Sequence, residues 1–327
     1  MNALLALALA VAPGMALAEA PRDTPAAVEV DREAPPPGRT ELGFDGGAEV
    51  PGWGATISGG WLERPIVLHS DDLDSVAVER RQTFGLGAAL ALGPSVVLDG
   101  RFTLAHQTGQ RLRIAGEPRA LDRWVPGDLR FGARIRVVRT PRVAAFLRGE
   151  LTLPTGDDHD FAGEASWAGA WSLIGRFALP HGLAFAVTGG IRLRGAEVLL
   201  ADRVVANELF GAAGVVVPLP PVRPLWCDPE YFKLTAELAG ILGDELAGRR
   251  GPSPLEARLG FVGRPHHDLT VGVRAGVGLV DEIGAPQFRA TLEVTYQGPY
   301  QLIPPRASEP PDDEDASDDE AADGVEL

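Results

Sequence analysis

The chain has 327 residues, of which 45% are hydrophobic, and its formal net charge is −15. The segment 309–327 holds ten Asp or Glu and no Lys or Arg, which leaves −15 + 10 = −5 for the rest of the chain. A mildly acidic body without a basic patch excludes nucleic acid as a partner. Cys227 is the single cysteine, so an internal disulfide and a cysteine-based zinc site are excluded. No motif indicates a cofactor.

The N-terminus predicts export. A short apolar run from Leu4 ends at Ala16-Leu17-Ala18, which has the small-residue pattern of a signal-peptide cleavage site. We therefore expect 1–18 to be a cleaved signal peptide. The Pro-rich segment 19–50 and the acidic tail 301–327 are expected to be disordered, since neither can bury enough apolar surface to order itself. The segment 51–300 remains as the folded domain.

Alternating apolar and polar residues predict β-strands from Trp53 onward. In the segment LAFAVTGGIRLR (183–194), one face is apolar, whereas the other carries small residues and ends in Arg192 and Arg194. The same alternation predicts strands at 53–63, 77–91, 95–106, 127–138, 142–153, 165–178, 182–194, 204–217, 230–242, 254–263, 268–279 and 287–297.

The number and spacing of these strands predict the fold class. The count is about twelve and even, and the connections alternate between short turns and long loops, as in outer-membrane barrels. We therefore expect an all-β protein, an antiparallel up-and-down transmembrane β-barrel in contact with outer-membrane lipid. Both ends of the barrel are expected in the periplasm. A soluble periplasmic β-protein stays open as an alternative, because a solvated antiparallel sheet gives the same alternation in any one strand.

The polar face of the strands is the candidate functional surface. In a closed barrel its charges line the lumen, where they set ion or small-solute selectivity if the lumen is open and fill it if they pair. The turn at 139–141 places Arg134 opposite Arg148 or near Glu150, as in a cross-strand charge ladder. The predicted lumen residues are Arg130, Arg134, Arg136, Arg148, Glu150, Arg192, Lys233, Glu237, Glu256, Arg258, Arg274, Arg289 and Glu293.

An acidic loop follows the strand that ends at Leu153. Its DDHD run (157–160) lacks two ligands of an EF-hand calcium loop, so no metal site is predicted. Weak cation binding by Asp157, Asp158 and Asp160 is the remaining alternative. We expect this loop to be exposed to solvent on the outer side of the cell. The protein is not expected to be an enzyme, because one loop cannot orient both a base and its substrate. A barrel enzyme or receptor that acts through its outer loops remains as the runner-up.

Four short motifs resemble a known class of barrel. GDLRFGAR (127–134), LPTGD (153–157), SPLEARLG (253–260) and GAPQFRATLEVTY (284–296) look like the outer-membrane β-barrel modules that precede OmpA-like peptidoglycan-binding domains in myxobacterial proteins. More loosely, they are similar to the barrel family named after the phenol meta-degradation pathway. The resemblance implies a channel or transporter. No peptidoglycan-binding domain is expected in this chain, since only an acidic tail follows the barrel.

Overall fold

The computed structural model describes residues 42–43, 52–70, 73–93, 95–110, 120–157, 160–200, 203–219, 232–243, 251–266, 268–280 and 283–298. The predicted signal peptide and acidic tail, together with most of the segment 19–50, lie outside these residues. The described chain is almost entirely β-structure, with one short 3-10 helix at Pro180–Gly182. Among the described residues, no helix is long and apolar enough to cross a membrane.

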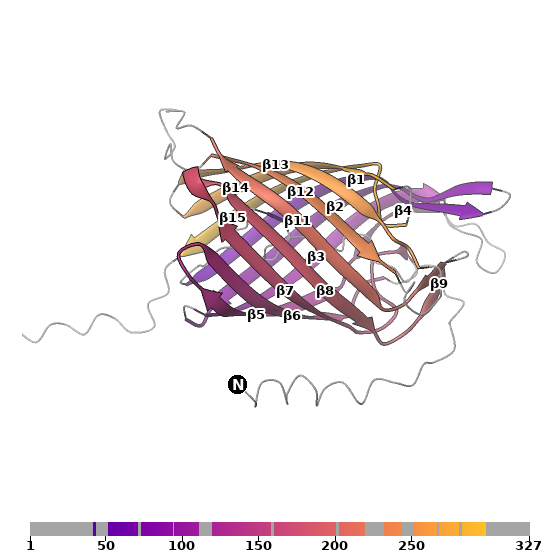
Figure 1. The fold of residues 1–327 in the computed structure, drawn as a ribbon. Helices are drawn as coiled ribbons and strands as arrows, with labels where there is room; N and C mark the ends of the chain where they lie inside the picture. The colour runs from indigo at the N-terminus through magenta and orange to yellow at the C-terminus, as the bar shows by residue number, and fades with distance from the viewer. Residues whose placement is uncertain are drawn as a thin grey trace, which may run out of the picture.

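The strands follow one another around a cylinder (Figure 1). They are β1 (Trp53–Ser70), β2 (Leu73–Ala91), β3 (Val96–Gln110), β4 (Ala120–Pro126), β5 (Leu129–Arg139), β6 (Val143–Leu153), β7 (Ala168–Ala178), β8 (Ala184–Arg194), β9 (Val198–Leu200), β10 (Arg203–Val205), β11 (Glu208–Pro218), β12 (Lys233–Leu242), β13 (Leu255–His266), β14 (Leu269–Gly278) and β15 (Phe288–Gly298).

Antiparallel pairing closes the cylinder. Each barrel strand pairs with its neighbours in sequence, and β1 pairs with β15 from Trp53↔Gly298 to Glu63↔Phe288. Both β4 and β5 pair with β3, one beyond the other, so together they act as a single interrupted strand. The barrel therefore has twelve strands, and the predicted fold class is confirmed. A closed barrel leaves no unpaired sheet edge, as a membrane-spanning sheet requires.

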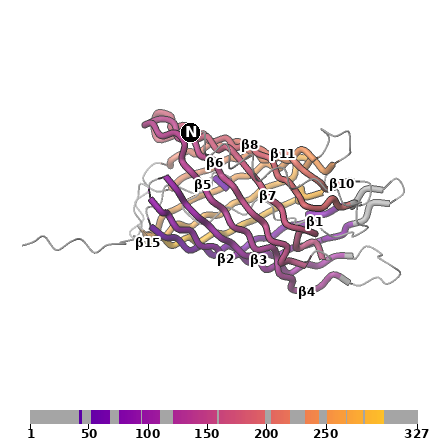
Figure 2. Tube along the Cα trace, turned by 90° about the horizontal axis from the view of Figure 1, so that it is seen from below, coloured from indigo at the N-terminus to yellow at the C-terminus, as the bar shows by residue number. Residues whose placement is uncertain are grey.

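The two ends of the barrel differ, as Figures 1 and 2 show. Short connections such as 140–142 and 179–183 lie at one end, the turn end, together with Trp53 and Gly298. Longer connections such as 154–167 and 279–287 lie at the other, the loop end. The β1–β2 hairpin extends past this end, and the connection between β8 and β11 forms the small β9–β10 hairpin, which the alternation did not predict.

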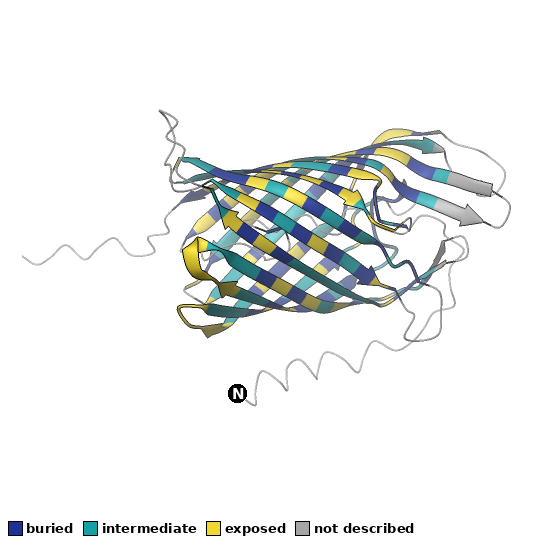
Figure 3. Ribbon diagram, turned by 45° about the horizontal axis from the view of Figure 1, so that its top comes forward, coloured by how far each residue is buried: buried dark blue, intermediate teal, exposed yellow. Residues whose placement is uncertain are grey.

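Exposed and buried residues alternate along the strands (Figure 3). The outward side chains are large and apolar, with Leu173 59% and Leu259 68% exposed. Between them lie inward residues such as Arg134, which is 3% exposed. A protein whose surface is apolar and whose interior is charged reverses the arrangement of a soluble domain, and it matches a strand that faces lipid on one side.

Candidate functional site

All thirteen predicted lumen residues occupy inward-facing positions on the strands. They do not form one uniform lining. Two separate ion-pair networks contain most of them, and a smaller group of cations lies toward the turn end. Of the two neighbours expected for Arg134, the register places Arg148 opposite it across β5 and β6.

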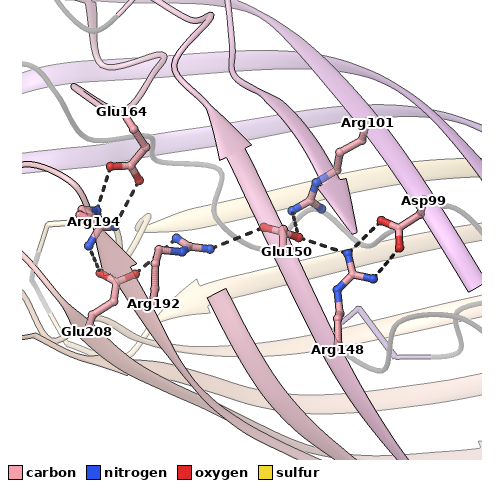
Figure 4. Close-up of polar contacts among 8 residues, drawn as sticks. All are labelled: Asp99, Arg101, Arg148, Glu150, Glu164, Arg192, Arg194 and Glu208. Carbon is pink, nitrogen blue, oxygen red and sulfur yellow. Dashed lines mark hydrogen bonds and ion pairs between the residues drawn. The ribbon is translucent and has the colours of Figure 1, made fainter. Parts of the chain in front are cut away.

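The first network runs along the inner wall from β3 to β11 (Figure 4). Arg148 forms a bidentate ion pair with Asp99, at 2.6 Å from Nη1 to Oδ2 and 2.9 Å from Nη2 to Oδ1. Its Nη2 also lies 3.2 Å from Glu150, which accepts a second bond from Arg101 at 3.4 Å. The network contains four cations and four acids, namely Asp99, Arg101, Arg148, Glu150, Glu164, Arg192, Arg194 and Glu208.

A glycine lets this network cross a strand. Asp99 lies on β3 and Arg148 on β6, with β5 between them. The bond passes over Gly132, where an added Cβ would lie 2.5 Å from Arg148 Nη2 and 2.6 Å from the Asp99 carboxylate oxygens. Any larger residue at this inward position would displace the ion pair, so Gly132 is a structural part of the network.

Arg194 joins the wall of the barrel to the loop end. Its Nε lies 2.8 Å from Glu164 Oε2, and its Nη1 lies 2.9 Å from Glu208 Oε2. All three side chains are at most 4% exposed. A buried arginine between two carboxylates satisfies charges that would otherwise be costly to remove from water.

The second network joins β12 to β15. Arg258 contacts both oxygens of Glu256, at 3.0 and 2.9 Å, and Arg289 Nε lies 2.9 Å from Glu256 Oε1. This last bond crosses β14 at Gly276, where a Cβ would lie 2.6 Å from the same oxygen. The network has three cations and three acids, namely Glu237, Glu256, Arg258, Arg274, Arg289 and Glu293. Among the side chains named here, the numbers of positive and negative charges are equal in this second network.

Of the remaining predicted cations, Arg130 is buried beside the first network, near Glu150 and Arg192, whereas the others lie nearer the turn end. Arg134 and Arg136 lie over the Phe146 ring, at 4.8 and 5.7 Å from its centroid. Arg136 and Lys233 are partly exposed, as is Arg176, an inward residue that the sequence analysis did not single out. Between these cations and the turns, the described inward-facing strand positions hold no Asp or Glu. This part of the interior is therefore positively charged in its described side chains.

The loop at 154–157 and 160–167, here called the mouth loop, differs from its prediction. It folds into the loop end of the barrel, and Asp160, Phe161 and Ala162 are all buried. Arg81 Nη1 donates to the Phe161 carbonyl at 2.7 Å, and Gln107 Nε2 donates to the Asp160 carbonyl at 2.5 Å. The expectation of an exposed loop is wrong for 160–162, where polar side chains of β2 and β3 satisfy the backbone inside the barrel. Pro154 and Thr155 are exposed, as expected.

An apolar cluster surrounds the mouth loop. Phe161 packs there with residues from β1, β2, β4, the β9–β10 hairpin and the β14–β15 connection, and none of them is more than 4% exposed. Phe161 also has φ = 58°, a left-handed conformation that is strained for an aromatic residue and needs surrounding contacts to hold it. The mouth cluster consists of Leu62, Ile66, Ala77, Val78, Leu121, Phe161, Val198, Val205 and Ile283.

Asp128 fastens both ends of the mouth loop. Its Oδ1 accepts the Gly156 N–H at 2.9 Å, and its Oδ2 accepts the Glu164 N–H at 2.7 Å. It immediately precedes β5, whose eleven residues already have the length of a membrane-spanning strand. Burial raises the pKa of the Asp128 carboxyl to about 6, although these two backbone bonds favour its charged form.

The candidate cation ligands of the mouth loop are held by an arginine. Arg123 Nη2 lies 2.5 Å from Asp157 Oδ2, and Arg123 also binds the Asp160 carboxylate. Asp158 lies outside the described residues. Within the described chain, no group of three or more His, Cys, Asp or Glu is arranged to hold a metal ion.

The sequence analysis missed five members of the β3–β11 network. Strand alternation could have indicated some of these five residues but not all of them. Arg194 shares the inward parity of Arg192 and could have been included on that ground. Asp99 and Arg101 occupy inward positions on β3, but the other inward residues of that strand are uncharged. The strand therefore did not show a row of charges that would have indicated a lumen face. Glu208 lies within the predicted strand 204–217 at an inward position and could have been included in the same way as Arg194. Glu164 lies in a loop, where alternation carries no information, so only the folded mouth places it.

Comparison with known proteins identifies the fold. No family model matches the sequence, and no curated protein matches it. The chain is similar to an outer membrane channel from Pseudomonas putida F1, with a TM-score of 0.57 and 14% identity over 79% of this chain and 99% of that one. KdgM porin in complex with disordered oligogalacturonate gives a TM-score of 0.44 at 8% identity, covering 75% and 99% of the two chains. LpxR from Salmonella typhimurium gives 0.42 at 10%, covering 75% and 100%. The likeness to the first structure shows that the chain has the fold of an outer-membrane β-barrel channel.

Proposed function

We propose that the protein is an outer-membrane channel for small solutes or ions, with the charged barrel interior as its conduction path. The observation that carries this proposal is the lining of a lipid-compatible barrel with charged side chains, many of them arginine. Charge inside a membrane protein is costly and marks a solute path or a polar network. The short motif resemblance to barrels of the phenol meta-degradation family supports the same function.

The ends of the barrel support an orientation. Outer-membrane barrels have short periplasmic turns and longer outer loops. We therefore place the turn end, with Trp53 and Gly298, in the periplasm, and the mouth loop on the outer side of the cell. Export through a cleaved signal peptide at 1–18 and contact of the apolar face with outer-membrane lipid complete the proposal.

The mouth loop and its cluster form the closure of this channel. The cluster joins segments from around the barrel rim, and its side chains exclude water. In this conformation the described segments at the outer end pack into this apolar cluster. Opening requires the mouth loop to move, and its hydrogen bonds and ion pairs with Arg81, Gln107, Arg123, Asp128 and Arg194 set how often that happens.

The distribution of charge predicts a preference for anions. The described inward positions between the turn-end cations and the turns hold no Asp or Glu, so this part of the interior carries the positive charge of residues such as Arg136 and Lys233. A charged side chain in a low-dielectric tube focuses its field along the path and raises the local concentration of counter-ions. Arg148 and Arg274 are poor probes of this effect, because a carboxylate in either place would break a buried network.

Arg136→Glu is the sharper test. Reversal potentials across planar bilayers in a salt gradient should show anion selectivity in the natural protein and a shift toward cations in this variant. The matched control is Arg142→Glu, which makes the same charge change at an exposed turn of the same end. An equal shift in both variants would contradict the assignment of Arg136 to the conduction path. A folded barrel without current in any variant would instead indicate a structural membrane protein.

A further inference from the structure

The turn end of the barrel carries a surplus of positive charge. Among its described residues are six arginine or lysine side chains, here called the basic rim, namely Arg136, Arg139, Arg142, Arg176, Lys233 and Arg264. Arg139 and Arg142 are exposed, and the other four are partly exposed. Asp268 is the one acid in the described turns of this end, and the inward strand positions beside them hold no Asp or Glu. This end of the molecule therefore attracts anionic groups.

Negative charge is concentrated in the acidic tail, which follows β15 in the sequence. β15 ends at Gly298, and Gly298 lies at the turn end beside Trp53. The positions from 309 to 327 hold ten Asp or Glu and no Lys or Arg. The cationic end of the described barrel is thus continuous in sequence with the most acidic segment of the chain.

The tail is long enough to reach the whole basic rim of its own barrel. A chain spans at most about 3.5 Å per residue, so the stretch from Gly298 to Glu309 reaches about 38 Å when extended. Twelve tilted strands about 4.8 Å apart form a cylinder about 25 Å across. Because tail and rim belong to one molecule, their effective concentration is about millimolar, and several weak contacts act together.

The inward cations of the rim favour the tail over lipid as the occupant. Arg136, Arg176 and Lys233 occupy inward-facing positions, inside the ring of strands. Lipid headgroups surround a barrel on its outer, apolar side, so they cannot contact these three side chains together. A polypeptide attached at the edge of the barrel can pass over that edge, and its carboxylates accept charge-assisted hydrogen bonds from arginine and lysine.

We propose that the acidic tail docks on the basic rim of its own barrel. A single exposed ion pair contributes little, but ten carboxylates can exchange among six cations and so keep several pairs formed at once. Docking weakens as salt screens these charges. Docked carboxylates also reduce the positive field at the turn end, which lowers anion selectivity. This effect on selectivity, unlike the docking itself, rests on the proposed function.

The single lysine of the chain makes the docking measurable. A carbodiimide joins a carboxylate directly to an amine, and Lys233 is the only lysine in the sequence. In phosphatidylcholine vesicles at about 0.01 M salt, mass spectrometry should find Lys233 joined to the peptide 307–327, which trypsin releases after Arg306. The yield should fall at least about fivefold at about 1 M salt, where the Debye length is about 3 Å instead of about 30 Å. A Lys233 amine that reacts with a small activated ester but is never joined to the tail would overturn the proposal.

Two introduced lysines test where the tail docks. Arg142→Lys places an amine at an exposed turn of the turn end, and it should be joined to the tail as Lys233 is. Arg80→Lys is the matched control, because it places an exposed amine near the loop end, where the bilayer separates it from the tail. Equal joining of the tail to both introduced lysines would contradict docking on the basic rim.

Lipid composition and reversal potentials separate the other outcomes. Loss of the cross-link at low salt when phosphatidylglycerol is added to the vesicles would mean that lipid headgroups occupy the rim, and it would overturn the proposal. A chain that ends at Arg306 should be more anion-selective in planar bilayers at low salt than the full chain. Equal selectivity of the two chains would overturn the effect of the tail on the field. Absence of current from both chains would contradict the proposed channel, while the cross-link would still support docking.

Discussion

Replacing Arg81 with methionine and Gln107 with leucine should raise the mean current through the barrel by about tenfold or more. Both natural side chains donate to carbonyls of the mouth loop, at Phe161 and Asp160. Without donors, these buried carbonyls destabilise the packed loop by about 1 to 3 kcal/mol each. A change of about 1.4 kcal/mol shifts the ratio of two conformations tenfold, so the open conformation gains at least that factor.

The control for the mouth variant lies next to it in sequence. Arg80→Met removes the same type of side chain from the outward face of β2, where Arg80 is 52% exposed and lies 3.9 Å from each of two exposed or partly exposed glutamates, Glu63 and Glu79. Its current should match that of the natural protein. If the Arg81→Met, Gln107→Leu barrel folds and conducts no more than this control, the mouth loop is not the closure.

Replacing Arg194 with methionine should lower the free energy of unfolding by about 3 to 5 kcal/mol, because it leaves a buried charge without its counter-ion. Arg194 separates Glu164 from Glu208, and all three side chains are at most 4% exposed. Methionine keeps much of the side-chain volume, so the loss reports on charge more than on packing. Urea titration of the barrel refolded in lipid vesicles, followed by tryptophan fluorescence, measures it.

A compensating variant separates the contribution of the buried charges to this stability loss from the contribution of side-chain packing. Glu164→Gln and Glu208→Gln together with Arg194→Met remove all three charges, and most of the lost stability should return because no carboxylate is left buried alone. A loss below about 1 kcal/mol for Arg194→Met would mean that water reaches this site and screens it. A triple variant as unstable as the single one would assign the loss to packing.

The fold could be predicted because every strand of a transmembrane barrel alternates outward apolar residues with inward polar ones, and this period of two is visible in the sequence. Rows such as Phe131, Leu147 and Val273 face outward as expected, and each is more than 40% exposed. Alternation also placed the charged residues on the inner face. It could not say which charges pair, because Asp99 and Arg148 lie two strands apart and meet only where Gly132 leaves space. The register between two adjacent strands does not show which side chains meet across a third strand.

The mouth loop shows a second limit of sequence reasoning. The acidic run around Asp157 suggested a solvated loop, yet the apolar residues Phe161 and Ala162 follow it directly and are buried. Those two residues are the one feature of the sequence that indicates a buried loop, because apolar side chains in a polar connection favour burial over exposure. Which partners they meet depends on loops distant in the sequence, such as that of Ile283. Likewise, the contact of Leu42 with Ala186 and Val216 was not predictable from a Pro-rich segment.

The central claim, that solutes pass through the charged interior, is tested most directly by blocking that interior with one chemical group. With Cys227 replaced by serine, Arg136→Cys introduces a single thiol at a partly exposed inward position. A bulky thiol reagent should lower the single-channel current at least about twofold in one step, and a reducing agent should restore it. Complete modification of the thiol with an unchanged current would contradict the account, because the conduction path would then not pass Arg136.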